Sequence, residues 1–257
     1  MDEQFDLKNL LSPDERKKDG ISLISARTKP EGLREAKKLL YRYSSRKSAL
    51  FLSGGLTPRP LYEDLAKEKK LILGSAALVD ERYGEVLNKE SNEKMMRDSG
   101  LLSYFDSINA PFYGVLHNNP MEKEAKDYEE TVRYLLSYFP HNIGVLGVGK
   151  DGHIGGIPAI PEISEKIIDE KRAYVSFYSE WQKGYNERIT MNFMSLSLLD
   201  LIIVLVLGKE KKDALKKMFE DPSADSGQVD LIAEVPARFL RKPEIAKKTI
   251  LITDQRI

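Results

Sequence analysis

The sequence predicts an α/β fold, a mostly parallel, doubly wound, Rossmann-like sheet with helices on both faces. Short apolar segments alternate with longer amphipathic stretches along the chain, as in successive βαβ units. Several of the short segments are almost continuously apolar, which is typical of strands that helices cover on both faces. The 257 residues contain no internal repeat and no obvious linker, so we expect a single domain over residues 1–257.

The strands and helices follow from the spacing of apolar residues and from the turn residues between them. The predicted strands are Ile21–Ser25, Ala49–Ser53, Ala76–Asp80, Phe112–Val115, Ile143–Leu146, Tyr174–Tyr178, Leu201–Leu207 and Thr249–Thr253. The predicted helices are Pro30–Tyr43, Pro58–Lys69, Asn92–Leu102, Glu122–Tyr138, Ile189–Leu198 and Lys209–Phe219. A charged N-terminal arm is expected around residues 1–20, and a polar loop at Asp221–Gln228.

The composition excludes several classes of protein. Lys plus Arg and Asp plus Glu both number 40, so the chain lacks the basic excess typical of nucleic-acid-binding proteins. The absence of Cys excludes disulfides, thiolate metal sites and Cys nucleophiles, and it fits a reducing compartment. The longest apolar run, Leu198–Leu207, is too short to span a bilayer. We therefore expect a cytoplasmic monomer or homodimer with no membrane or nucleic-acid partner.

The run Gly147–His153 is the most informative motif, because it places one of only three histidines directly after an apolar strand. In α/β proteins, ligands bind beyond the carboxyl ends of the strands. A histidine there can act as a general base near neutral pH, and Asp151, two residues earlier, can orient its ring. An ordinary glycine-rich turn with an incidental histidine is the alternative. No spacing of His, Asp and Glu argues for a metal.

The run Ser53–Pro58 follows the strand Ala49–Leu52 and is rich in small residues. Ser53, Gly54, Gly55 and Thr57 let backbone N–H groups approach an anion before a helix that begins near Pro58. This arrangement predicts a cradle for a phosphate or a carboxylate. The spacing does not match a P-loop, and an ordinary strand-to-helix turn is the alternative.

A second group of polar residues, Asp80–Glu81–Arg82, follows the strand Ala76–Val79. Arg82 can hold a carboxylate or phosphate bidentately, whereas a solvated corner is the simpler interpretation. Ser91, further along, can cap the next helix. Lys211 begins another helix, where a lysine is poorly placed for the helix dipole and better placed to meet a bound anion. Because parallel strands end at one edge, these groups are expected to meet there.

Together these motifs resemble the 6-phosphogluconolactonases and the related glucosamine-6-phosphate deaminases. The resemblance covers roughly residues 30–255, from Ser-Gly-Gly-x-Thr-Pro through Asp-Glu-Arg, Ser91–Asn92 and Gly-x-Gly-x-Asp-Gly-His, and it continues through Glu187–Thr190, Gly208–Lys211 and Val235–Ala237. Lysine 183, five residues before Arg188, favours the lactonases. Pro158 falls about where deaminases carry a glutamate that assists ring opening. The stretch 154–159 departs from the usual lactonase sequence, and Met191–Asn192 leans towards the deaminases.

The resemblance implies hydrolysis of 6-phosphoglucono-δ-lactone, a step of the pentose phosphate pathway, without a cofactor. His153 would activate water, with Asp151 as its orienting partner. Arg82 or the N–H groups of Gly54–Gly55 would stabilise the oxyanion. Lys183, Arg188 and Lys211 are the candidate ligands of the 6-phosphate.

Two alternatives stay open. The first is a deaminase or isomerase of an amino-sugar phosphate, in which Asp80 would abstract a proton from C2. The second is a regulator that binds a sugar phosphate without turning it over.

Overall fold

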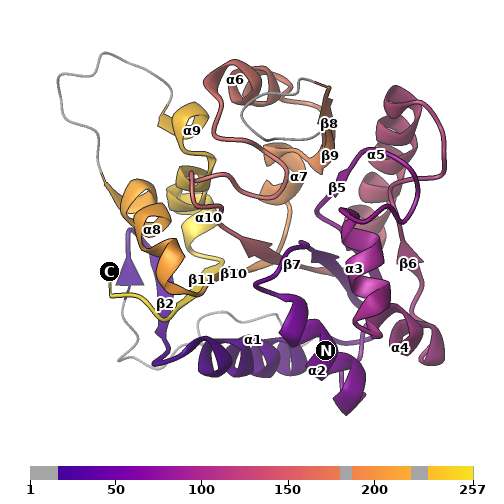
Figure 1. The fold of residues 1–257 in the computed structure, drawn as a ribbon, viewed down its shortest axis with the longest axis horizontal. Helices are drawn as coiled ribbons and strands as arrows, with labels where there is room; N and C mark the ends of the chain where they lie inside the picture. Colours follow the sequence, from indigo (N-terminus) through magenta and orange to yellow (C-terminus); the bar gives the residue numbers. More distant parts are fainter. Residues whose placement is uncertain (1–16, 180–186, 221–230, 257) are drawn as a thin grey trace.

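The computed structural model describes residues 17–179, 187–220 and 231–256, which contain two sheets and the helices around them (Figure 1). The main sheet has the strand order β1-β2-β11-β10-β7-β3-β4-β6. Every neighbouring pair in it is parallel except β1 and β2. The predicted fold class, a mostly parallel doubly wound sheet, is confirmed.

The strands of the main sheet are β1 (Lys17–Lys18), β2 (Ile21–Ser25), β3 (Ser48–Leu52), β4 (Ser75–Leu78), β6 (Phe112–Tyr113), β7 (His141–Gly147), β10 (Leu201–Val206) and β11 (Thr249–Thr253). The α-helices are α1 (Lys29–Tyr43), α2 (Arg59–Glu68), α3 (Asn92–Asp98), α4 (Leu101–Ser107), α5 (Met121–Tyr138), α6 (Pro161–Asp169), α7 (Phe193–Ser197), α8 (Lys212–Phe219), α9 (Leu231–Glu234) and α10 (Pro243–Ala246), with 3-10 turns η2 (Lys209–Lys211) and η3 (Pro236–Arg241).

Helices cover both faces of the main sheet. Helices α1 and α2 pack together below it in Figure 1, and α7 and α8 lie above it. This distribution follows from the right-handed crossover between parallel strands, because the chain moves in one direction from β2 to β6 and in the other from β7 to β11. The strands β3 and β10 are buried along their whole length, as their continuous apolar sequences predict.

The direction of winding changes between β3 and β7, which pair in parallel at the centre of the sheet. The chain leaves β3 towards α2 on one face, and it leaves β7 towards the opposite face. A crevice therefore opens between the carboxyl ends of these two strands, at the place where doubly wound sheets bind their ligands. The runs Ser53–Thr57 and Val148–His153 both begin at this crevice.

A second, three-stranded sheet was not predicted. It consists of β5 (Asp80–Arg82), β9 (Arg188–Met191) and β8 (Val175–Tyr178), all antiparallel to their neighbours. The prediction that Ala76–Asp80 forms one strand is wrong, because β4 ends at Leu78 and Asp80 begins β5 in the other sheet. The apolar pattern does not show which sheet a strand joins.

The predicted helix Ile189–Leu198 is wrong in its first part. Residues Arg188–Met191 form β9, which pairs with β5 on one side and β8 on the other. The β-branched Ile189 and Thr190 suit this strand, and α7 begins only after Asn192, whose side chain accepts a hydrogen bond from the Met194 N–H. Pairing with two strands outweighs the weak helical pattern.

Further differences concern how the helices are divided and which short elements form. The predicted helix Asn92–Leu102 is divided into α3 and α4 at Gly100, whose φ of 79° is left-handed. Helix α6 was not predicted. Lys17–Lys18 of the expected arm form β1, whereas residues 1–16 and the loop Asp221–Gln228 lie outside the described residues.

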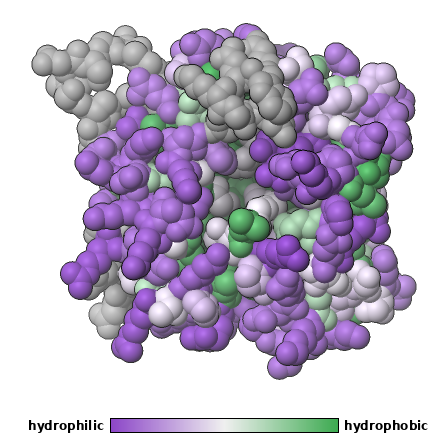
Figure 2. All heavy atoms as spheres, in the orientation of Figure 1, coloured by the Kyte–Doolittle hydropathy of each residue, from purple (hydrophilic) through white to green (hydrophobic). Residues whose placement is uncertain are grey.

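Hydrophilic side chains dominate the face of the molecule shown in Figure 2. No helix in the described ranges is long and apolar enough to cross a membrane.

Tyr62 of α2 ties this helix to the end of β3 and generates a test of the fold. Its buried hydroxyl donates a 2.7 Å hydrogen bond to the Ser53 carbonyl oxygen. Tyr62→Phe leaves that carbonyl without its partner, so we expect the free energy of unfolding to fall by about 1–3 kcal/mol in urea titrations. Tyr138→Phe is the matched control, because Tyr138 is exposed. If the wild type and Tyr62→Phe unfolded at the same urea concentration, the Tyr62 hydrogen bond would not stabilise the fold.

Candidate active site

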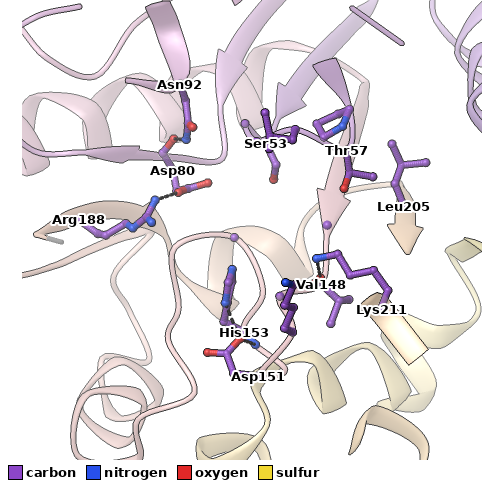
Figure 3. A pocket seen from close by; sticks show the side chains of 18 of the residues that line it. Ser53, Thr57, Asp80, Asn92, Val148, Asp151, His153, Arg188, Leu205 and Lys211 are labelled. Carbon is purple, nitrogen blue, oxygen red and sulfur yellow. Dashed lines mark hydrogen bonds and ion pairs between the residues drawn. The ribbon is translucent and has the colours of Figure 1, made fainter. Parts of the chain in front are cut away.

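A cavity of about 510 Å³ opens at the carboxyl edge of the main sheet (Figure 3). Its wall comes from the turns after β3 and β7, from β5 and β9 of the second sheet, and from Lys211 after β10. The residues predicted from the sequence that line it are Ser53, Gly54, Gly55, Thr57, Asp80, Arg82, Asp151, His153, Arg188 and Lys211. The remaining one, lysine 183, lies outside the described residues.

His153 and Asp151 form a hydrogen-bonded pair at the end of β7. The distance from His153 Nδ1 to Asp151 Oδ1 is 2.7 Å. An ionised carboxylate can only accept, so Nδ1 carries the proton and the lone pair of the neutral ring lies on Nε2. Burial alone would raise the pKa of Asp151, but the hydrogen bond and the charge of His153 outweigh burial and lower it. Asp151 therefore remains ionised and fixes the tautomer that a general base needs.

Glycines make room for this pair. A Cβ at Gly149 would lie 2.0 Å from His153 Nδ1 and 2.6 Å from Asp151 Oδ1, so only glycine fits beside the two side chains. Gly152 has a φ of 103°, and a Cβ there would meet Val235 Cγ1 at 2.6 Å. The second and third glycines of the pattern Gly-x-Gly-x-Asp-Gly-His are thus required by backbone geometry and by the space that neighbouring side chains occupy.

The turn after β3 presents unpartnered polar groups to the cavity. Ser53 is buried, and its Oγ has no hydrogen-bond partner among the described residues. The N–H groups of Gly54 and Gly55 likewise donate to no acceptor in the described part of the chain. Gly55 has a φ of 97° that favours glycine. With α2 beginning at Arg59, this geometry suits an anion.

Asp80 and Arg188 form an ion pair across the second sheet. Arg188 Nη1 lies 2.8 Å from Asp80 Oδ2 (Figure 3). The Asp80 side chain is buried, and the Arg188 side chain is 14% exposed. Asp80 lies opposite Thr190 in the β5–β9 pair, two positions from Arg188, so the two side chains meet diagonally on one face. The ion pair therefore depends on β9, most of which was predicted to be helical.

Arg82 forms no ion pair with a carboxylate among the described residues, although the charges of Asp80, Glu81 and Glu90 act on it from nearby. Its Nη1 donates to the Glu90 carbonyl oxygen at 2.6 Å and to Asn92 Oδ1 at 2.7 Å. Burial, followed by the charge of Arg188 directly opposite on β9, lowers the pKa of Arg82. A guanidinium remains charged in spite of this, so Arg82 keeps its charge at some energetic cost.

Lys211 reaches the cavity from the other side, across from Asp80 in Figure 3. Its Nζ donates a 2.6 Å hydrogen bond to the Val148 carbonyl oxygen. Burial lowers the pKa of Lys211, and the nearby carboxylates of Glu210 and Asp151 only partly oppose this effect. An anion bound beside Lys211 would restore its charged form.

The atypical stretch 154–159 is anchored at Gly156. The Gly156 N–H donates to Thr190 Oγ1 at 3.1 Å, and its carbonyl oxygen accepts from the Tyr178 hydroxyl at 2.9 Å. A Cβ at Gly156 would lie 2.7 Å from Thr190 Cβ. Neighbouring Gly155 also lines the cavity, and its φ of 55° is in the left-handed region that favours glycine.

The sequence analysis did not assign some lining residues to the site. Asn92 was part of a motif but received no role, and Leu56, Lys150 and Leu205 also border the cavity. Ser91 caps α3 as predicted, since its Oγ accepts from the Lys94 N–H. No group of three or more His, Asp or Glu side chains that could hold a metal occurs in the ranges that the structure describes.

The family model for glucosamine-6-phosphate isomerases/6-phosphogluconolactonase matches residues 33–250, which include every pocket residue named above. This chain belongs to that family.

Individual relatives of the chain include both types of enzyme in the family. A 6-phosphogluconolactonase of Nostoc sp. is 30% identical over 74% of this chain and 76% of its own length. A glucosamine-6-phosphate deaminase of Lacticaseibacillus paracasei is 28% identical over 75% of this chain and 79% of its own. The crystal structure of 6-phosphogluconolactonase from Thermotoga maritima is 25% identical, with a TM-score of 0.67, covering 91% of this chain and 98% of that one.

Gly149→Ala tests the geometry of the histidine pair. We expect the added methyl group to push the ring away from Asp151, because it would otherwise lie 2.0 Å from Nδ1. Histidine-selective NMR measures this, since only three histidines contribute and the Nδ1 proton bonded to a carboxylate resonates far downfield. Gly147→Ala is the control, because its Cβ would meet nothing closer than 3.9 Å. An unchanged His153 signal in Gly149→Ala would contradict the geometry.

Proposed function

We propose that this chain hydrolyses 6-phosphoglucono-δ-lactone to 6-phosphogluconate, with His153 as the general base. The observation that carries the proposal is the hydrogen-bonded Asp151–His153 pair. It shares one cavity with the glycine-rich turn after β3 and with the cationic side chains of Arg82 and Lys211. The curated lactonase relatives support the same reaction.

The reaction begins with a water molecule between His153 and the C1 carbonyl of the lactone. Nε2 takes a proton from this water as its oxygen attacks C1, and Asp151 stabilises the imidazolium that forms. The tetrahedral intermediate then expels the ring oxygen, which receives the proton from Nε2. One water is consumed, one C–O bond is broken, and the base is regenerated. A base positioned in this way contributes about 10²–10⁴ in rate.

The negative charge on the C1 oxygen needs a partner in the transition state. Arg82 suits this role, because it faces the cavity with a charge that neutral oxygens hold in place but do not cancel. A fixed donor at such a position is worth about 10²–10³ in rate.

The 6-phosphate fits the opposite side of the cavity. Ser53, Thr57 and the N–H groups of Gly54 and Gly55 supply donors, and Lys211 supplies charge. Arg188 and lysine 183 remain further proposed ligands of the phosphate. Arg188 would bind it as a member of the ion pair with Asp80.

The deaminase alternative is less compatible with this site. Abstraction of a C2 proton by Asp80 would protonate that carboxylate and break its buried ion pair with Arg188. The other carboxylate that lines the cavity, Asp151, is engaged by His153. Pro158 stands near the position where deaminases carry a ring-opening glutamate, so neither proton-transfer step has an available group among the lining residues.

The regulator alternative does not explain why the base and its orienting carboxylate are both in place. We propose that the chain acts on its sugar phosphate without a cofactor, as a single domain, in the cytoplasm, and as a monomer or homodimer. We propose no nucleic-acid partner.

The first prediction concerns the base. Freshly prepared 6-phosphoglucono-δ-lactone should be hydrolysed well above the spontaneous rate, and His153→Ala should lower kcat by about 10²–10⁴ with the fold retained. His117→Ala is the control, because His117 lies outside the cavity. If His153→Ala hydrolysed the lactone at the wild-type rate, His153 would not be the general base. No turnover by the folded wild type, with ammonia released from glucosamine-6-phosphate, would favour the deaminase.

The second prediction concerns Lys211 and pH. Above about pH 8 the phosphate is a constant dianion, because its second pKa is about 6. Binding of 6-phosphogluconate, measured by calorimetry, should weaken as pH rises towards the lowered pKa of Lys211, at a lower pH than for a lysine near 10.5. Lys211→Arg should remove this dependence, since arginine stays charged. The same pH profile in both proteins would exclude Lys211 from the phosphate site.

A further inference from the structure

Asn92 stands out because it contacts three separate parts of the cavity and is almost completely buried. Its Oδ1 accepts from Arg82 Nη1 at 2.7 Å, and its Nδ2 donates to the Asp80 carbonyl oxygen at 2.7 Å. A Cβ at Gly54 would lie 1.8 Å from Asn92 Oδ1, so the amide occupies the space that this glycine leaves open. Figure 3 shows Asn92 beside Asp80, at the rim of the cavity.

The orientation of the amide is fixed by chemistry. A guanidinium only donates and a carbonyl oxygen only accepts, so Oδ1 must face Arg82 and Nδ2 must face Asp80. The backbone of Asn92 is held as well, because its N–H donates to Glu81 Oε1 at 2.8 Å. The same carboxylate accepts from the N–H groups of Arg82 and Glu93. Asn92 therefore offers Arg82 an acceptor that can neither rotate nor move away.

The amide oxygen of Asn92 carries no net charge, and this determines how much positive charge Arg82 presents to the cavity. Arg82 stands directly opposite Arg188 across the β5–β9 pair, an arrangement of like charges that costs stability. Arg188 is neutralised by Asp80, whereas the acceptors of Arg82 are an amide oxygen and the carbonyl oxygen of Glu90. A carboxylate at position 92 would relieve the repulsion. It would also cancel the charge that Arg82 presents to the cavity.

We propose that Asn92 is a positioning residue for lactone hydrolysis, which holds Arg82 through a neutral acceptor and so keeps the charge of Arg82 available to the C1 oxyanion. This inference rests on the proposed function. It adds a division of labour between the two arginines: Arg188 forms the ion pair with Asp80, and the charge of Arg82 is kept for the C1 oxyanion.

The test compares Asn92→Asp with Asn92→Ala in the full chain. Asn92→Asp keeps the shape of the side chain but neutralises Arg82, so kcat should fall by about 10²-fold while KM changes little, because the phosphate binds elsewhere. Asn92→Ala leaves Arg82 charged but less well fixed, and kcat should fall less. Aspartate cannot donate to the Asp80 carbonyl oxygen, so the free energy of unfolding of both variants is measured alongside kcat. The Arg82→Ala background then separates this structural effect from an effect on Arg82. Asn109→Asp is the control, because it adds a carboxylate at an exposed position outside the cavity and should leave kcat nearly unchanged.

Arg82→Ala separates an effect through Arg82 from a direct one. In that background, Asn92→Asp and Asn92→Ala should cause little further loss of kcat, because the group they act on is absent. Should Asn92→Asp fail to fold by circular dichroism, Asn92→Ala with and without Arg82→Ala still gives this coupling. Equal losses in both backgrounds would overturn the inference, as would an Asn92→Asp enzyme with wild-type kcat.

Failure of the proposed function can be distinguished from failure of this inference. If the folded wild type does not hydrolyse the lactone, calorimetry with 6-phosphogluconate and with inorganic phosphate decides the role of Asn92. Asn92→Asp should then weaken binding of 6-phosphogluconate, which carries a carboxylate at C1, more than Asn92→Ala does, with inorganic phosphate bound alike by all three proteins. Equal affinities for 6-phosphogluconate would overturn the inference.

Discussion

The geometry of the cavity depends on one residue that is hydrogen-bonded to both sheets, Val79. Its N–H donates to the Leu52 carbonyl oxygen of β3 in the main sheet, and its carbonyl oxygen accepts from the Met191 N–H of the second sheet. At this point the chain turns from β4 into β5, over the carboxyl edge of the main sheet. Asp80 and Arg82 therefore lie across the cavity from the turns after β3 and β7. Strand β9 pairs with β5 and adds Arg188 to the same wall. A regular parallel sheet alone would supply only the histidine turn and the anion-binding turn. The crossing at Val79 adds the charged wall that faces them.

The charges in the cavity are divided between internal pairs and groups that face the substrate. Asp151 is bonded to His153 and Asp80 is paired with Arg188, so both carboxylates are used within the protein. Burial lowers the pKa of both Arg82 and Lys211, which shows that the folded chain holds these cations against their preference for water. A ligand with an anionic group at each end would offset the desolvation of both cations. A phosphorylated lactone acquires its second negative centre only in the transition state. In the proposed role, Arg82 would therefore stabilise that state more than the ground state, as catalysis requires.

The parts of this site that are local in sequence could be predicted from the sequence, and the parts that depend on pairing between distant segments could not. The turns at Ser53 and Gly149 were recognisable because glycine, a preceding apolar strand and a following helix leave few alternatives. The second sheet was missed because Arg188–Met191 is four residues long and becomes a strand only when β5 and β8 lie on either side. The role of Asn92 was out of reach for a similar reason: its contacts with Gly54 and Arg82 join segments that have no periodic relationship in the sequence.

The relatives of this chain catalyse two different reactions, lactone hydrolysis and deamination. The pairs Asp151–His153 and Asp80–Arg188 give a physical reason why this cavity suits the first reaction better than the second. Lactone hydrolysis needs one base and one stabilised oxyanion, because the ester is already reactive. Deamination with isomerisation also needs a carboxylate that shuttles a proton at C2 and a group that opens the sugar ring. In this chain Arg188 engages the carboxylate that would shuttle the proton, and the turn after His153 contributes Gly155, which has no side chain, to the cavity wall. Restoring the second chemistry would therefore require at least two coordinated changes, the release of Asp80 and a new acid near His153, and either change alone would weaken the first chemistry without completing the second.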